Sequence, residues 1–214
     1  TISKLSYSKY YFPSESFTML AAIESGNWWF RSRNQIIIWA LRRFVPEFRD
    51  FLEVGCGTGF VLQGVSGAFP TVQLKGTEYF DEGLFHARER IPQAEFIQLD
   101  ARLMTDTMSH DVIGAFDVIE HIEGDELVLN NLANALRSGG SLFLTVPQHR
   151  WLWSSLDEQA CHVRRYSRKE LMNKVSKTGL KVKYVSSFVS FLVPLMWLSR
   201  LRAKAQSDAS SEFH

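Results

Sequence analysis

The sequence predicts an α/β protein with a doubly wound, mostly parallel sheet and helices on both faces. Two observations support this prediction. Short apolar runs alternate with segments of helical periodicity from about residue 50 to residue 188, which is the order of repeated β-α-β units. A glycine-rich turn also stands where the first apolar run gives way to a helical pattern, the usual place of a ligand-binding loop in such sheets.

The strands and helices are expected to alternate along the chain. Strands are predicted at residues 50–54, 72–77, 95–99, 111–116, 141–146 and 180–188. Helices are predicted between them at residues 59–67, 81–90, 125–137 and 168–178. The last helix has the clearest ends, because Ser167 and Glu170 form a capping-box pattern and Gly179 follows as a stop residue.

Residues 1–48 are expected to form a helical cap that precedes the sheet domain of residues 49–188. Two segments, 14–25 and 33–44, have a helical pattern, and neither has a strand partner. Ligands of open α/β sheets bind at the carboxyl ends of the strands. The two helices therefore either cover that end as a lid or pack elsewhere as an appendage.

The composition favours a soluble, cytoplasmic globular protein. The 214 residues include 24 basic and 23 acidic side chains, a net charge of +1, so no overall attraction to nucleic acid is expected. The two cysteines, Cys56 and Cys161, lack the spacing of a zinc site, and no metal site is predicted. The first residues are polar and aromatic and lack the apolar core of a secretory signal.

The glycine-rich turn, which runs from Glu53 to Gly59, has the properties of a binding loop. Glycine lets the backbone turn sharply and approach a ligand closely, and the following helix presents free N–H groups. The spacing is G-x-G-x-G and not the G-x-G-x-x-G of dinucleotide sites, because Phe60 and Val61 stand where a later glycine would fall. A polar or anionic ligand without a bridging pyrophosphate is therefore expected.

Acidic residues at the ends of the next two strands complete a predicted nucleoside site. Glu78 ends the second strand about 20 residues beyond the glycines, where a carboxylate suits a ribose diol. Asp100 follows the third strand with Ala101, where it could accept a hydrogen bond from an adenine amino group. Either carboxylate alone is more often a solvated loop residue. Together with the glycine turn, they predict a site for an adenosine moiety.

These features resemble the class I S-adenosylmethionine-dependent methyltransferases, in particular the subgroup that includes the ubiquinone-type O-methyltransferases. The resemblance runs from about residue 50 to residue 146 and rests on the glycine turn, Glu78, Asp100 and the segments 116–122 and 136–140. It implies a Rossmann-like fold, S-adenosylmethionine as cofactor, S-adenosylhomocysteine as product and methyl transfer to a small-molecule acceptor. The cofactor-binding residues that it implies are Glu53, Gly55, Cys56, Gly57, Gly59, Glu78, Tyr79, Asp100, Ala101, Phe116, Asp117 and His121.

Residues 147–167 are expected to form the acceptor site. The segment follows the fifth strand and is rich in Trp, His and Arg, which suits a ring or an acidic acceptor. The predicted substrate residues are His149, Trp151, Trp153 and Arg165. The alternative is structural: the tryptophans pack the loop onto the sheet, and its arginines pair with its acidic residues.

Methyl transfer from a sulfonium is an in-line displacement that mainly needs donor and acceptor to be aligned. An oxygen acceptor would gain from a base near neutrality, and the predicted catalytic residues are His121, His162 and Tyr166. Two other functions stay open. A nicotinamide-dependent oxidoreductase shares the sheet but usually has G-x-G-x-x-G, and a non-catalytic domain could keep the cofactor site as a scaffold.

The C-terminal part, residues 189–214, is expected to hold an apolar helix and a polar tail. Residues 184–199 carry no charge and are followed by Arg200, Arg202 and Lys204, a run too short for a membrane span. Three roles are open: a sixth strand leading into a core or lid helix, peripheral contact of residues 184–204 with an anionic membrane, or a homodimer contact. The sheet of the resembling family normally ends with a seventh strand, and no segment after Lys204 has its pattern.

Overall fold

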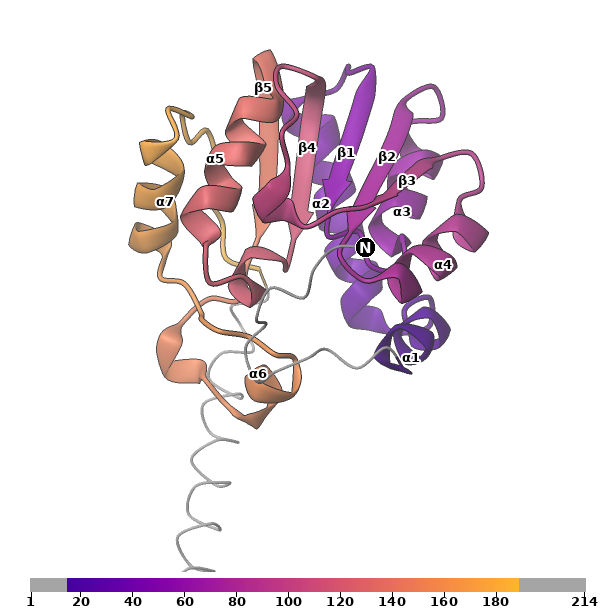
Figure 1. Cartoon of the computed structure of the whole chain (residues 1–214), viewed down its shortest axis with the longest axis horizontal. Helices are drawn as coiled ribbons and strands as arrows, with labels where there is room; N and C mark the ends of the chain where they lie inside the picture. Colours follow the sequence, from indigo (N-terminus) through magenta and orange to yellow (C-terminus); the bar gives the residue numbers. More distant parts are fainter. Residues whose placement is uncertain (1–14, 189–214) are drawn as a thin grey trace, which may run out of the picture.

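The computed structural model describes residues 15–188, which form a parallel sheet with helices on both faces (Figure 1). The five strands lie in the order β3-β2-β1-β4-β5. Their bounds are β1 (Asp50–Val54), β2 (Gln73–Glu78), β3 (Glu95–Gln98), β4 (His110–Phe116) and β5 (Leu136–Thr145). The chain order reverses between β1 and β4, so the carboxyl ends of these strands form the switch point at which such sheets bind ligands.

Register and side-chain alternation divide the core into two halves. Val54 of β1 lies opposite Thr77 of β2 and Ala115 of β4, so the ends of the three central strands are level. Successive strand residues point to opposite faces. Phe51 belongs to one buried cluster and Leu52 to the other.

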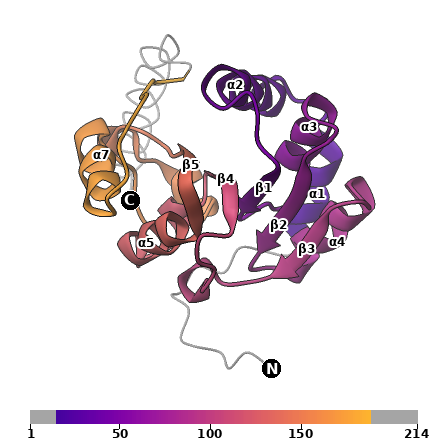
Figure 2. The ribbon, with the colours of Figure 1, turned by 90° about the horizontal axis from the view of Figure 1, so that it is seen from above.

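Helices cover both faces of the sheet (Figure 2). The Phe51 cluster contains residues of α2 (Trp28–Phe44), α3 (Phe60–Ala68) and α4 (Asp81–Arg90). The Leu52 cluster contains residues of α5 (Asp125–Ala135) and is flanked by α7 (Arg168–Lys177). As predicted, Ser167 and Glu170 form a capping box at the start of α7, and Gly179 beyond its end has a φ of 84°.

The N-terminal helices combine the two roles considered for them. The second helix begins at Trp28, earlier than predicted, because the side chain of Asn27 accepts a hydrogen bond from Trp29 N at 2.9 Å. Ile37 and Leu41 of α2 are buried in the core, as expected of a packed helix. By contrast, α1 (Glu15–Ile23) lies near the carboxyl ends of the strands (Figure 1).

Two predicted elements are corrected by the structure. The helix expected at 125–137 ends at Ala135, because Met108 N and Ser109 N donate to the carbonyls of Asn134 and Ala135 and the chain then enters β5. The sixth strand expected at 180–188 is absent: residues 180–187 have no regular secondary structure. The side chains of residues 181–184 are exposed, so no second face buries their apolar members.

The remaining expectations for the C-terminal part lie largely outside the described residues. The segment 189–214, and with it most of the predicted membrane or dimer contact and any seventh strand, is not among them. Within residues 15–188, no helix is long and apolar enough to cross a membrane. The membrane and dimer contacts stay predictions.

Candidate functional site

The glycine turn after β1 adopts a backbone that other residues rarely accept. Gly55, Gly57 and Gly59 have φ angles of 70°, 52° and 77°. The amide of Gly55 donates to the carbonyl of Thr77 at 2.7 Å, which ties the turn to the end of β2. A Cβ atom at Gly55 would lie 2.5 Å from Cγ2 of Val118. The turn therefore needs glycine at this position for both conformation and space.

Glu78 joins the end of β2 to the glycine turn. Its Oε2 accepts a hydrogen bond from Gly57 N at 3.0 Å, and its Oε1 accepts from Tyr79 N at 2.8 Å and Phe80 N at 3.1 Å. Burial raises the pKa of Glu78, and the three amide bonds oppose that shift. The carboxylate predicted to lie beside the glycines is thus fixed against them.

Glu53 places a second carboxylate below the same turn. Within residues 15–188, its Oε2 is buried and has no hydrogen-bond partner. Burial raises the pKa of Glu53 to about 8, although Arg33 and a backbone hydrogen bond from Leu62 oppose the shift. A buried, unpaired carboxyl oxygen is costly and suits a cationic or donating ligand group.

Asp100 lies at the next strand end, after β3. Its carboxylate accepts from Arg102 N at 2.9 Å and forms an ion pair with Arg102 Nη2 at 2.6 Å. Ala101 is buried at the start of the short helix η1 (Ala101–Leu103). The carboxylate proposed for adenine is therefore also engaged by a neighbouring cation.

The N-terminal helices cover the glycine turn. Phe17 of α1 comes to 4.0 Å from the position of a Cβ at Gly57. Glu24 accepts from Thr58 Oγ1 at 2.6 Å and from Arg90 Nη1 at 2.8 Å, which links α1, the turn and α4. Sequence reasoning assigned no role to these residues, because nothing in the helical pattern marks which polar side chains meet the turn.

Asp117 follows β4 in a strained conformation at the switch point. Its φ is 57°, which is unusual for a residue other than glycine. Oδ1 accepts from Thr145 Oγ1 at 3.0 Å, and Oδ2 forms a short ion pair with Arg33 of α2. Phe116, just before it, is buried. The predicted wall of the site is thus clamped from both the sheet and the cap.

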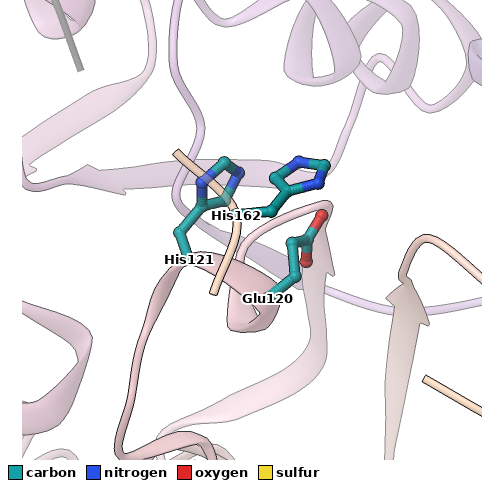
Figure 3. Close-up of side chains that lie close together, drawn as sticks. All are labelled: Glu120, His121 and His162. Atoms are coloured by element: carbon teal, nitrogen blue, oxygen red, sulfur yellow. The ribbon is translucent and has the colours of Figure 1, made fainter. Parts of the chain in front are cut away.

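Two of the predicted catalytic residues meet. The rings of His121 and His162 are edge to face, with centroids 4.7 Å apart. Burial, aided by the nearby His162, lowers the pKa of His121 to about 4. Glu120 completes the group, and ligand atoms of all three residues lie within 4.8 Å of one another (Figure 3). The sequence predicted no metal site and gave Glu120 no role of its own.

Tyr166, the third predicted catalytic residue, does not join this group. Its side chain is buried, and its hydroxyl donates to Asp125 Oδ2 at 2.7 Å. Burial and this bond raise the pKa of the phenol. The catalytic role stays a prediction, and in the structure the hydroxyl is engaged by Asp125 inside the core.

The acceptor segment shows parts of both alternatives. Arg165 pairs with Asp157, Nε to Oδ1 at 2.6 Å, as the structural alternative expected. Arg164 pairs with Asp125 of α5 and not with the acidic residues of the segment. Within residues 15–188, Trp151 and Trp153 are 56% and 37% exposed, and Nε1 of Trp153 donates to Glu158 Oε1 at 3.4 Å. Both rings thus keep exposed surface, whereas Arg165 is held in place.

His149, the remaining predicted substrate residue, lies beside this aromatic surface. Its ring centroid is 5.4 Å from that of Trp151, and its φ is 67°. Both residues lie in the connection between β5 and α6 (Ser155–Gln159).

Known proteins of two kinds are similar to this chain. A probable S-adenosylmethionine-dependent methyltransferase of Mycobacterium tuberculosis is 33% identical over 124 residues, which is 56% of this chain and 43% of the relative. A trans-aconitate 2-methyltransferase of Variovorax paradoxus is 32% identical over 107 residues, covering 50% of this chain and 41% of the relative. The chain thus spans less than half the length of these curated relatives.

A solved structure shows the same fold at lower identity. Phosphoethanolamine N-methyltransferase 2 of Haemonchus contortus, in complex with phosphomonomethylethanolamine and S-adenosylhomocysteine, superposes with a TM-score of 0.69. It is 20% identical, and the match covers 92% of this chain and 49% of that one. The narrower likeness to ubiquinone-type O-methyltransferases stays a prediction. Residues 29–185 match the family described as methyltransferase domain, and the chain belongs to this family.

Proposed function

We propose that this domain binds S-adenosylmethionine at the carboxyl ends of β1, β2 and β3 and transfers its methyl group to a small-molecule acceptor. The observation that carries the proposal is the hydrogen bond between Gly57 N and Glu78, which sets a ribose-type carboxylate against a left-handed glycine turn. Relatives named as S-adenosylmethionine-dependent methyltransferases support it. Trans-aconitate 2-methyltransferases are also similar to this chain, and the acceptor in their name is a small molecule.

The polar groups of the turn fit the parts of this cofactor. The unpaired Oε2 of Glu53 suits the ammonium of the methionine part. Oε2 of Glu78 accepts one hydrogen bond, from Gly57, and has capacity for a ribose hydroxyl. Asp100 and Ala101 would hold the adenine. The other cofactor residues proposed are Gly55, Cys56, Gly59, Tyr79, Phe116, Asp117 and His121.

The chemistry demands alignment more than covalent participation by the protein. When bound, the cofactor supplies an electrophilic methyl group on a sulfonium. The ion pair between Arg33 and Asp117 fixes the wall of the site, and the exposed rings of Trp151 and Trp153 offer a surface for the acceptor. His149 and Arg165 would contact the acceptor. With a pKa of about 4, His121 is neutral at pH 7 and can accept a hydrogen bond from the acceptor, but it is too weak a base to take a proton efficiently.

Calorimetry with S-adenosylhomocysteine tests the cofactor site. We expect one molecule to bind per chain and Glu53→Gln to weaken binding about tenfold, because a carboxyl that can ionise opposite the ammonium is replaced by an amide that cannot. Glu47→Gln, an exposed carboxylate outside the site, is the matched control and should bind as the native chain does. Binding of NADH in place of S-adenosylhomocysteine would support the oxidoreductase alternative. Cofactor binding without turnover across a broad panel of acceptors would support a scaffold.

A further inference from the structure

Three potential metal ligands converge beside the proposed acceptor site. Glu120 and His121 belong to the short helix η2 (Ile119–His121) after β4, and His162 comes from the loop after α6. One ligand atom of each lies within 4.8 Å of the others. Figure 3 shows the carboxylate and the two rings turned toward a common space. Residues from distant parts of the chain are thus gathered at one point.

Glu120 is the second, independent sign of a ligand. Its side chain is 0% exposed, and among the described residues neither carboxylate oxygen has a hydrogen-bond partner. Buried carboxylates are normally paired, hydrogen-bonded or bound to a metal, because an isolated one is costly. The free oxygens face two imidazoles, which are the usual partners of a carboxylate around a transition metal.

His162 is oriented as metal-binding histidines commonly are. Its Nδ1 lies 3.0 Å from Oδ1 of Asp157. Asp157 is itself fixed by Arg165 and by the amide of Ser154, the latter at 2.9 Å. An Nδ1–H that donates to this carboxylate leaves the lone pair on Nε2 for a ligand. A carboxylate behind the imidazole fixes the ring and raises its strength as a ligand.

We propose that Glu120, His121 and His162 form a binding site for a divalent first-row transition-metal ion. Two nitrogen donors and one carboxylate are typical of Zn²⁺ or Fe²⁺ sites, whereas Mg²⁺ and Ca²⁺ prefer oxygen ligands throughout. Three protein ligands leave at least one coordination position for water or another molecule. The site was not predicted from the sequence, because its ligands have no zinc-finger spacing.

The position of the site suggests what would occupy the open coordination position. Glu120 lies three residues after Asp117, at the same end of the sheet as the glycine turn. An acceptor hydroxyl or carboxylate bound to the ion would be held there and polarised. This second step rests on the proposed methyl transfer, whereas binding of the metal does not.

Metal binding can be measured directly on the untagged full chain. After treatment with a chelator, the chain is titrated with Zn²⁺ by calorimetry and with Co²⁺ by visible absorption, and bound metal is counted after dialysis. We expect one ion per chain, with little binding of Mg²⁺. Glu120→Gln and His162→Gln should abolish stoichiometric binding. Asp157→Asn should weaken it roughly 10- to 100-fold, as expected of a carboxylate that supports a metal-binding histidine.

Matched measurements separate the site from adventitious binding and from misfolding. His149→Gln changes a histidine of the same segment outside the cluster and should leave the Zn²⁺ affinity unchanged. Thermal melting shows whether each variant is folded, and Glu120→Gln keeps the shape of the side chain and removes only a carboxyl without a hydrogen-bond partner, so it should fold about as well as the native chain. The proposal would be overturned if the native chain bound less than one ion, or if folded Glu120→Gln and His162→Gln bound Zn²⁺ as tightly as the native chain does. Calorimetry with S-adenosylhomocysteine in the same samples reports on the cofactor site separately.

Discussion

Arg33 of α2 forms an ion pair with Asp117, the residue that directly follows β4, and the two side chains are 15% and 32% exposed. The pair connects the N-terminal cap to the switch point of the sheet. It also holds Asp117 at a φ of 57°, a conformation that costs free energy and persists only where neighbours enforce it. The cap is therefore connected to the switch point and does not only cover the core.

Replacement of Arg33 by alanine should loosen this connection. We expect the free energy of unfolding to fall by about 2 kcal/mol, because a partly buried carboxylate loses a charged hydrogen-bond partner. Binding of S-adenosylhomocysteine should weaken as well. Urea unfolding and calorimetry measure the two effects. Arg31→Ala, an exposed arginine on the same helix, should change stability by less than about 0.5 kcal/mol. Equal effects of the two variants would contradict the assigned role.

The buried Glu53 predicts a dependence of stability on pH. Burial raises its pKa in the folded chain from the ordinary 4.5 to about 8, so the folded state binds the proton more tightly than the unfolded state. The contribution of protonated Glu53 to the free energy of unfolding is fully present below pH 4.5 and is lost as the pH rises through about 8. Its upper bound is about 5 kcal/mol. Urea unfolding of the ligand-free chain between pH 5 and pH 9 would measure it.

Glu53→Gln is the matched variant for this prediction, since glutamine keeps the shape and cannot ionise. The variant should lose most of the decline in stability between about pH 4.5 and pH 8. At pH 8 it should be more stable than the native chain. A decline that persists unchanged in the variant would assign the pH dependence to other groups.

The sequence predicted the elements whose patterns are local. The first strand, residues 50–54, was predicted with the bounds observed for β1, and α4 was predicted over residues 81–90 as found. The glycine turn and Glu78 were also predicted, because G-x-G-x-G and a carboxylate at the next strand end are local signals. The wrong strand at 180–188 shows the limit: an apolar pattern predicts a strand only where a partner and a second face exist.

Contacts between distant segments could not be predicted. Arg33 with Asp117, Glu24 with Arg90, and Glu120 with His162 all join residues that are far apart in the chain and belong to no spacing motif. The bond between Tyr166 and Asp125 is of the same kind, because no local pattern shows that this hydroxyl lies in the core.

Tyr166→Phe should separate stability from ligand binding. The variant removes a hydroxyl that donates to Asp125 Oδ2 at 2.7 Å and leaves the ring in the core. We expect a loss of about 1 to 2 kcal/mol, moderated because Lys174 Nζ still pairs with Asp125 at 2.6 Å. Affinity for S-adenosylhomocysteine should not change. Denaturation and calorimetry provide the measurements. A large loss of affinity for S-adenosylhomocysteine with little loss of stability would instead support a role of Tyr166 in ligand binding.

Gly55→Ala should affect both the fold and the cofactor site. The added Cβ would lie 2.5 Å from Cγ2 of Val118, and a φ of 70° is strained for alanine. Gly139→Ala is the control, because Gly139 has a φ of 82° but nothing within 4 Å of its Cβ position, so it reports the strain alone. We expect losses of about 3 kcal/mol for Gly55→Ala and about 1 kcal/mol for Gly139→Ala.

Binding distinguishes the two glycine variants further. Gly55→Ala should weaken S-adenosylhomocysteine strongly, since relief of the clash must move either the turn or Val118, which lies two residues before Glu120. Gly139 lies in β5, away from the turn, so its variant should bind as the native chain does. If both variants lost the same stability and both kept the affinity, the contact between Gly55 and Val118 would not be what fixes the shape of the turn.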